Sequence, residues 1–160
     1  MELQQQIQTF IELTNEYEQL FSQLTFGEES NFEENNHLEL RSLLHLVVEL
    51  QEDVIEFRLK KIITLENPYL SRIDIEKVRQ RTTQCQPSFQ QLSNIFKSQR
   101  SEVARLLQSI PISNWLRYGL LEGEGHVTFR ELIRRYFEFD RDFFQMLKEY
   151  VQQNEWISFD

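Results

Sequence analysis

The 160-residue chain has a formal net charge of -9, 40% hydrophobic residues and a single cysteine, Cys85. A lone cysteine excludes an internal disulfide and favours a reducing compartment, so we expect a soluble, cytoplasmic protein. The length of the chain predicts one domain, over residues 1–152, with a short tail at 153–160. Only four glycines and three prolines are present, which favours helices joined by few loops over many short strands.

The first predicted helix runs from about Leu3 to Leu24. Gly27 is expected to end it, and residues 28–36 are expected to form an exposed acidic loop. The helix has an apolar stripe with steps of three and four: Leu3, Ile7, Phe10 or Ile11, Tyr17, Leu20 or Phe21, and Leu24.

The second predicted helix runs from about Asn36, which has capping-box spacing to Glu39, to about Ile63. Its most apolar window, residues 43–48, is too short to span a bilayer, so no membrane partner is expected. A wide apolar arc is predicted from Leu43, Leu44, Val47, Val48, Leu50, Val54, Ile55, Phe57 and Ile62. Beside that arc, steps of four, three and four place an imidazole and three carboxylates on one stripe: His45, Glu49, Glu52 and Glu56.

A long connection is predicted after Pro68, with one short helix around residues 74–81. The third long helix is expected to start near Pro87, with a Ser88–Gln91 capping box, and to end at Pro111.

Residues 112–115 are expected to form a single turn that tucks Trp115 against the other helices. Gly123 and Gly125 predict a second turn before the final helix, which starts at a Thr128–Glu131 capping box. That helix is predicted to bury Leu132, Tyr136, Phe139, Phe143, Met146 or Leu147, and Tyr150. Four amphipathic helices with a long connection between the second and third predict an all-α four-helix bundle.

Charge is distributed unevenly along the chain. Residues 1–57 hold 13 acids and one base, a net charge of -12, and residues 58–160 hold 13 acids and 16 bases, a net charge of +3. Seven bases are candidates for nucleic-acid contact: Arg58, Lys60, Lys61, Arg72, Lys77, Arg79 and Arg81. We expect neighbouring acidic and basic helices to neutralise each other instead, because the overall negative field repels a polyanion.

Several short motifs together resemble the DinB-like superfamily of four-helix bundles. They are His45-Leu46 followed by Glu49, the Gln86-Pro87 start of the third helix, the run Ile110–Trp115, and the entry to the last helix at Gly125–Leu132. Members of this superfamily commonly bind zinc or nickel through three histidines, one on the second helix and two spaced four apart on the last.

Carried over to this chain, the resemblance implies His45 as the first ligand, whereas the other two positions hold Phe139 and Phe143. A phenyl ring has no lone pair to donate, and a catalytic metal needs about three protein ligands. We therefore expect a degenerate member without the metal, with both rings in the core and a binding or interaction role toward a small-molecule ligand or a second copy in a homodimer. Phe144 and Trp156 are the residues expected at an exposed interface.

The alternative is a metal-dependent transferase or hydrolase, similar to the thiol transferases among DinB-like proteins. It would hold zinc, nickel or manganese at His45, with Glu49, Glu52 and Asp142 as substitute ligands. Asp140 is a further carboxylate on the same stretch of the last helix.

Overall fold

The protein is mostly helical, with a small three-stranded sheet, in a computed structural model that describes residues 3–31, 34–85 and 87–153. The elements in chain order are α1 (Leu3–Asn31), α2 (Glu34–Val54), the π-helical turn η1 (Ile55–Leu59), α3 (Lys60–Thr64), β1 (Tyr69–Leu70), α4 (Ile75–Arg81), α5 (Phe89–Ser109), the 3-10 turn η2 (Ile112–Leu116), β2 (Tyr118–Leu121), β3 (Gly125–Thr128) and α6 (Phe129–Gln153).

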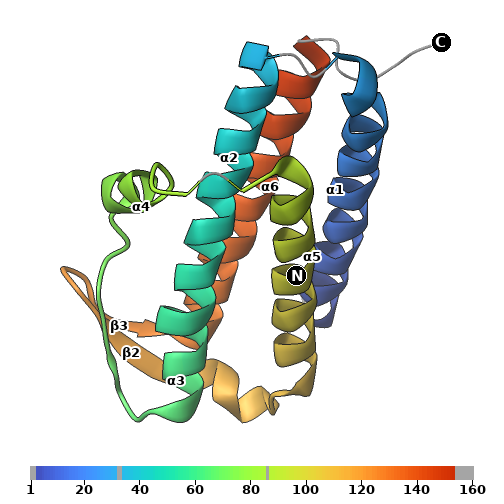
Figure 1. Cartoon of the computed structure of the whole chain (residues 1–160). Coiled ribbons are helices and arrows are strands. Elements are labelled where there is room, and N and C mark those ends of the chain that lie inside the picture. The colour runs from blue at the N-terminus through green and yellow to red at the C-terminus, as the bar shows by residue number, and fades with distance from the viewer. Residues whose placement is uncertain (1–2, 32–33, 86, 154–160) are drawn as a thin grey trace.

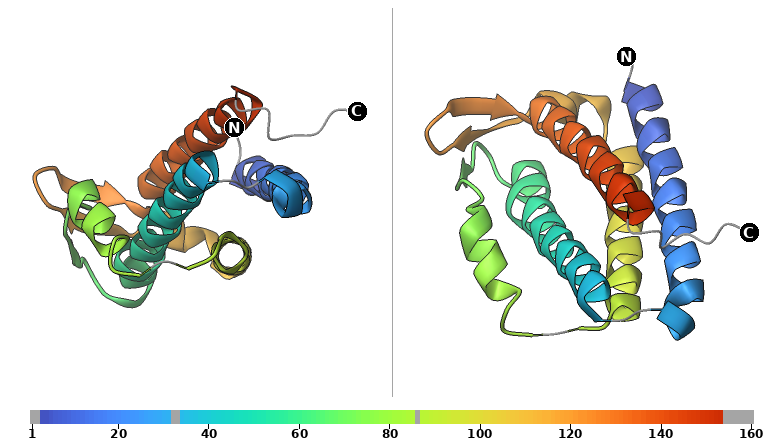
Figure 2. Two further views of the ribbon diagram at one scale, coloured as in Figure 1. Left: turned by 45° about the horizontal axis from the view of Figure 1, so that its top comes forward. Right: turned by 90° about the horizontal axis from the view of Figure 1, so that it is seen from above.

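The long helices α1, α2, α5 and α6 lie side by side, and α5 packs closely against both α1 and α2 (Figures 1 and 2). Helix α4 lies beside α2 on the side that faces away from α5 and α1, and the β2–β3 hairpin extends toward that same side. The long predicted connection therefore forms an outer layer next to α2. In the described part of the chain, no helix combines the length and the apolar character needed to cross a membrane.

Helix α1 is longer than predicted, because it continues through Gly27 to Asn31. A glycine inside a helix costs only about 1 kcal/mol relative to alanine, so without a proline or another stop signal it does not end the helix. The prediction of a loop is wrong for residues 28–31 and 34–36, which are helical, and residues 32–33 lie outside the described residues.

The second predicted helix is confirmed as a continuous run from Glu34 to Thr64 that includes the π-helical turn η1. Its predicted start is wrong, because the helix begins at Glu34 and Asn36 lies inside it rather than at its N-cap. Buried Gln51, Ile55 and Leu59 follow one another in steps of four. In a regular α-helix, a residue four positions further along points about 40° away from the first, viewed down the helix axis. A wider π-helical turn reduces this angle, so the three side chains stay closer to one face. Phe57 was predicted in the apolar arc, but it is 61% exposed.

The predicted helix starts are largely confirmed. Asp74 caps α4 by accepting from the backbone N–H groups of Glu76 and Lys77, and Ser88 and Gln91 form both halves of a capping box on α5. At α6, Thr128 Oγ1 accepts from the Glu131 N–H at 3.1 Å.

The small sheet was not predicted. Strand β2 pairs antiparallel with β3, and β1 joins the other edge of β2 in parallel, with Tyr69 opposite Leu120. Gly123 and Gly125 occupy the predicted turn with φ of 80° and 96°, a conformation that glycine adopts without strain. The all-α prediction holds for most of the chain and misses this sheet.

The buried face of α6 differs from the predicted stripe. Phe139 is 40% exposed, whereas Phe137 and Phe144 are buried. Of the alternatives Met146 and Leu147, Leu147 is the buried residue, as the prediction allowed. Phe144 is therefore not the exposed interface residue that was expected, and Trp156 lies outside the described residues. The buried residues of α6 are Phe129, Leu132, Ile133, Tyr136, Phe137, Asp140, Phe143, Phe144, Leu147 and Val151.

The core consists of two apolar clusters along the length of the helices. One lies next to the sheet and contains Trp115, which packs edge-on against Phe129 and is buried as predicted. The other surrounds Tyr17, whose ring packs edge-on against Phe96 and Phe144.

Candidate ligand-binding groove

A layer of buried polar side chains joins the four long helices. The Arg100 guanidinium of α5 donates to both carboxylate oxygens of Asp140 on α6, at 2.6 and 2.8 Å. The Tyr17 hydroxyl of α1 donates to Asp140 Oδ1 at 3.2 Å, and Gln51 of α2 accepts from Arg100 at 3.4 Å. Asp140 was considered as a metal ligand, but in the structure its carboxylate is occupied by these donors.

The Gln51 side chain connects this layer to a second tyrosine. The Tyr136 hydroxyl donates to Gln51 Oε1 at 2.8 Å, and Gln51 Nε2 donates to Gln99 Oε1 at 2.8 Å. Burial raises the pKa of Tyr17 and of Tyr136 above the ordinary value, so both hydroxyls remain protonated donors at neutral pH.

The residues predicted to bind a metal do not come together as a ligand set. His45 is 6% exposed, and burial lowers its pKa below the ordinary value. Glu49 accepts from Arg81 of α4 at 3.2 Å, and Glu52 and Asp142 are exposed. Across residues 3–31, 34–85 and 87–153, no group of three or more His, Cys, Asp or Glu side chains is arranged to hold a metal ion.

The two phenylalanines at the positions implied by the resemblance have different environments. Their rings stack with centroids 6.1 Å apart, but Phe143 is buried and Phe139 is 40% exposed. The expectation that both rings belong to the core is therefore wrong for Phe139. Its exposed side faces a groove between α2 and α6.

This groove has a volume of about 220 Å³ and a predominantly apolar lining. One wall comes from α2 and η1, the opposite wall from α6, and the third side from the chain that leads into α4. The lining residues are Leu50, Val54, Arg58, Leu59, Ile73, Ile75, Leu132, Arg135, Tyr136 and Phe139. Buried Tyr136 forms the floor of the groove. Its ring is held in place because its hydroxyl donates to Gln51.

The π-helical turn lies in the groove wall. Val54 precedes η1, and Arg58 and Leu59 belong to it. Single π-helical turns inside α-helices occur frequently at functional sites, because the widened turn redirects the side chains that follow. In this chain the turn contributes one charged and one apolar side chain to the same groove.

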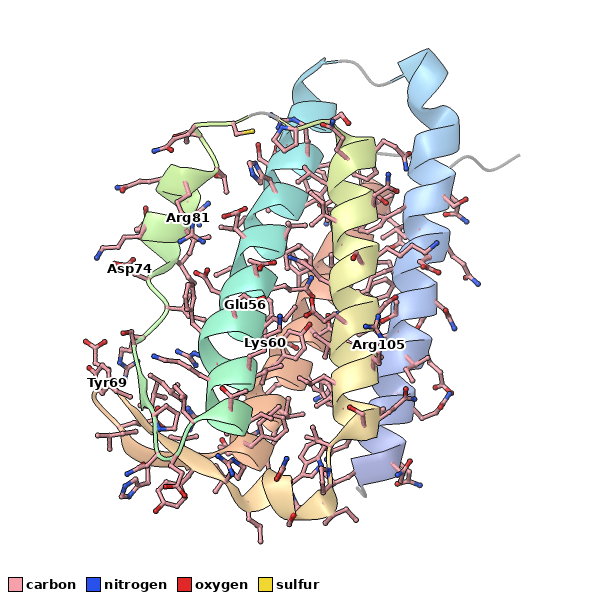
Figure 3. All side chains as sticks on the ribbon, turned by 60° about the horizontal axis from the view of Figure 1, so that its bottom comes forward. Glu56, Lys60, Tyr69, Asp74, Arg81 and Arg105 are labelled. Carbon is pink, nitrogen blue, oxygen red and sulfur yellow. The ribbon has the colours of Figure 1, made fainter. Side chains whose placement is uncertain are left out.

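Helix α4 is fixed to α2 by ion pairs. Arg81 donates to Glu49 and to Asp53, each at 3.2 Å, and Asp74 caps the start of the helix (Figure 3). Next to the sheet, the Lys61 ammonium donates to the Tyr69 carbonyl at 2.8 Å. These contacts hold the third side of the groove in position at both of its ends.

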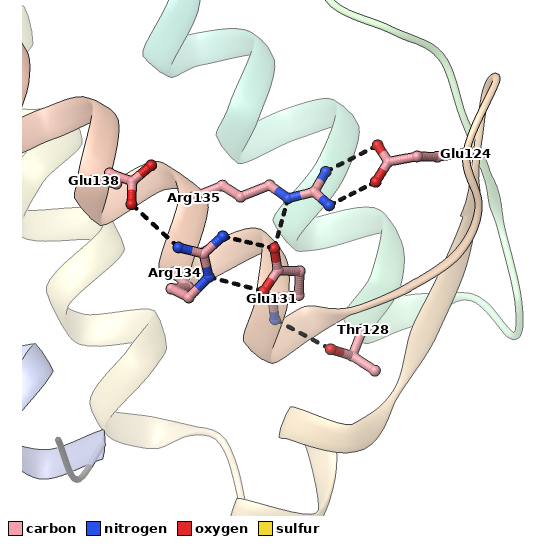
Figure 4. Close-up of polar contacts among 6 residues, drawn as sticks. All are labelled: Glu124, Thr128, Glu131, Arg134, Arg135 and Glu138. Atoms are coloured by element: carbon pink, nitrogen blue, oxygen red, sulfur yellow. Dashed lines mark hydrogen bonds and ion pairs between the residues drawn. The ribbon is translucent and has the colours of Figure 1, made fainter.

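One end of the groove is rich in arginine. Arg135 is bound by Glu124 of the hairpin turn, at 2.6 and 3.0 Å, and by Glu131 at 2.8 Å (Figure 4). The Glu131 carboxylate also accepts two bonds from Arg134. Of the capping box predicted with Thr128, the bond from the Glu131 N–H to Thr128 Oγ1 is present. Arg135 is therefore neutralised by its two carboxylate partners.

Arg58 lacks such partners. It makes one hydrogen bond, from Nη2 to the Ser71 carbonyl at 3.1 Å, and its buried Nε has no partner within the described chain. Burial lowers the pKa of Arg58, and the nearby guanidinium groups of Arg135 and Arg72 lower it further. The sequence identified Arg58 only as one of seven candidate bases. Its lack of an ion pair among the residues that the structure describes follows from the tertiary structure.

Comparison with known proteins does not identify a family for this chain. A scan against protein-family models, a search of curated proteins and a search of solved structures each returned no match.

Proposed function

We propose that this protein is a non-catalytic binding protein with a four-helix bundle of DinB-like topology, and that the groove between α2 and α6 holds a small apolar ligand. The single observation that carries the proposal is that Phe139, at a position where the resemblance implies a metal ligand, is an exposed wall of an apolar groove. In this proposal the metal chemistry of the superfamily is lost and the site serves binding alone.

Apolar side chains of the groove are exposed to water, and covering them would contribute favourable free energy to ligand binding. Phe139 is 40% and Ile75 is 48% exposed, so both leave apolar surface in water. Covering apolar surface stabilises a complex by roughly 25 cal/mol per Å². Sites for drug-sized molecules measure about 300–1,000 Å³, so a groove of about 220 Å³ fits a smaller ligand.

The groove is also organised in advance. The Tyr136–Gln51 bond fixes its floor, and the ion pairs of Arg81 fix α4 against α2. A site whose walls are held before binding loses less conformational entropy when a ligand enters. Weak binding of an unspecialised apolar probe should therefore be measurable.

The experiment is a titration of the full ¹⁵N-labelled chain with n-hexanol, followed by two-dimensional NMR. We expect saturable shifts that are largest at the amides of groove residues such as Leu50, Val54 and Leu132. Leu50→Trp fills the groove and should weaken hexanol binding by about tenfold, because the added ring occupies the volume that the ligand needs.

The matched control is Leu46→Trp, the same substitution one helical turn earlier on α2, at a half-buried leucine outside the groove lining. It should leave the affinity for hexanol unchanged. Shifts that do not saturate, or equal affinities in the two tryptophan variants, would show that the groove is not a binding site.

A further inference from the structure

We infer that the ligand of this groove is a small apolar carboxylate, an alkyl or aryl group ending in one anionic oxygen pair, and that Arg58 binds its carboxylate. This inference rests on the proposed binding function and specifies the chemical class of the ligand. It follows from the Arg58 guanidinium, which forms no ion pair with the described residues and whose Nε has no partner there, at one end of a predominantly apolar groove.

Arg58 differs from three other arginines of the described chain. Arg81, Arg100 and Arg135 each donate to carboxylates. Arg58 is half-buried, yet within the described residues it forms no ion pair. A desolvated charge without a counter-ion is costly, so a bound anion would remove a penalty that the unliganded protein carries.

The donors of Arg58 suit a carboxylate. A guanidinium has five N–H donors in one plane, and the structure uses one of them, Nη2, for the Ser71 carbonyl. Two parallel N–H donors match the two oxygens of a carboxylate, and such charge-assisted bonds are about twice as strong as neutral ones. In this inference, the donors of Arg58 that the Ser71 carbonyl leaves free bind one carboxylate.

The surrounding charges favour a monoanion. Arg72 and Arg135 add positive potential near Arg58, whereas Glu124 opposes it. Because Glu124 and Glu131 already bind Arg135, and Arg72 does not line the groove, Arg58 is the lining guanidinium without a carboxylate partner among the described residues, which matches a single negative charge. The apolar walls formed by Leu50, Val54 and Phe139 then accept the hydrocarbon part of the ligand.

The experiment compares two probes of the same length and different charge, hexanoate and n-hexanol, at pH 7, where a carboxylic acid of this kind is ionised. Binding to the full chain is measured by NMR titration. We expect hexanoate to bind at least about tenfold more tightly than hexanol, which is the gain expected from one charge-assisted contact. In Arg58→Met, which keeps an apolar stem, this preference should disappear while hexanol binding remains.

Two further variants complete the test. Arg58→Lys keeps the charge without the planar pair of donors and should retain part of the preference. Arg105→Met changes an exposed arginine on α5, outside the groove lining, and should leave both affinities unchanged (Figure 3).

The outcomes separate the two proposals. If hexanol binds in the groove and hexanoate binds no better, or if Arg58→Met keeps the preference, the carboxylate inference is wrong and the binding function stands. If neither probe gives saturable shifts in the groove, the proposed binding function itself is wrong.

Discussion

Arg100 and Asp140, 40 residues apart in sequence, form a bidentate ion pair between α5 and α6. The pair lies in the protein interior, with side chains that are 0% and 5% exposed. The guanidinium also lies over the Phe10 ring, 4.0 Å from its centroid, and donates to Thr14 Oγ1 at 2.9 Å. The pair therefore holds α1, α5 and α6 at one level of the core.

Removing one partner of this pair should be strongly destabilising. Asp140→Asn leaves the buried Arg100 charge without its counter-ion, and we expect the free energy of unfolding to fall by about 3–5 kcal/mol. Urea unfolding followed by circular dichroism measures this loss. Asp142→Asn, an exposed acid on the same helix, is the control and should change stability by less than about 0.5 kcal/mol.

The losses in the free energy of unfolding from substituting Arg100 and from substituting Asp140 should not be additive. Arg100→Met combined with Asp140→Leu removes both charges, so the double variant should be more stable than the sum of the two single losses predicts, by more than about 1 kcal/mol. Additive losses would contradict a direct interaction between the two side chains.

Introducing histidines on α6 tests the resemblance to the DinB-like superfamily. Phe139→His with Phe143→His should create zinc affinity that the parent lacks, because His45 would then have the two partners implied by the motif. At a free zinc concentration of 100 times Kd, binding raises the free energy of unfolding by about 2.7 kcal/mol. Calorimetric titration with zinc, on protein without an affinity tag, measures the affinity directly.

The matched controls are Phe139→His alone and the double variant with His45→Ala, and neither should bind zinc tightly. Since Phe143 is buried, all comparisons are made between zinc-loaded and zinc-free forms of the same variant. If the double variant takes up no zinc, the correspondence between α6 and the last helix of the superfamily is incorrect.

The burial of His45 should make stability depend on pH near neutrality. Burial lowers its pKa in the folded protein below the ordinary value of 6.5, whereas Glu49 acts in the opposite direction. The unfolded chain then binds the proton more readily, so this contribution to stability is complete above pH 6.5 and is lost as the pH falls toward the folded-state pKa.

The measurement is the free energy of unfolding between pH 7.5 and 5.5, for the parent and for His45→Gln. The difference between the two profiles isolates the histidine, because the carboxylates are common to both. A parent profile that runs parallel to the variant over this range would contradict the prediction.

The ion pairs at the start of α6 should make the stability depend on pH in the acid range. Hydrogen bonds from Arg134 and Arg135 lower the pKa of Glu131 to about 2, from an ordinary value of 4.5 (Figure 4). The folded state therefore gains from the ionised carboxylate above about pH 4.5, and this gain is lost as the pH falls toward 2.

Glu131→Gln should remove that acid dependence. At pH 7 the loss should be no more than about 1 kcal/mol, because Glu131 is one-third exposed and solvent screens its ion pairs. Glu138→Gln, which removes a single exposed pair with Arg134, is the control and should change the acid profile less. Thermal unfolding between pH 2 and pH 7 measures both effects.

Much of the fold was predictable from local sequence. The bounds of α4 and α5, the capping box at Ser88 and the burial of Trp115 were predicted and are confirmed. These features depend on residues within a few positions of one another, so their determinants can be read along the chain. The continuation of α1 past Gly27 was mispredicted because one glycine costs a long helix too little to end it.

The groove was less predictable. Its apolar walls follow from helical periodicity. The π-helical turn has no such signal, because steps of four are also the spacing of an ordinary α-helix. Strands β2 and β3 are four residues each and gain stability only by pairing, so neither is evident from its own sequence.

The sequence by itself determined where most of the helices lie and which of their faces are broadly apolar, because hydrophobic periodicity and end caps act within one or two turns. Only the tertiary structure decided that Arg100 binds Asp140, that Phe139 lines a groove while Phe143 is buried, and that Arg58 forms no ion pair with any described residue. Each of these depends on which distant side chains approach within a few ångströms, which the packing of helices against one another fixes.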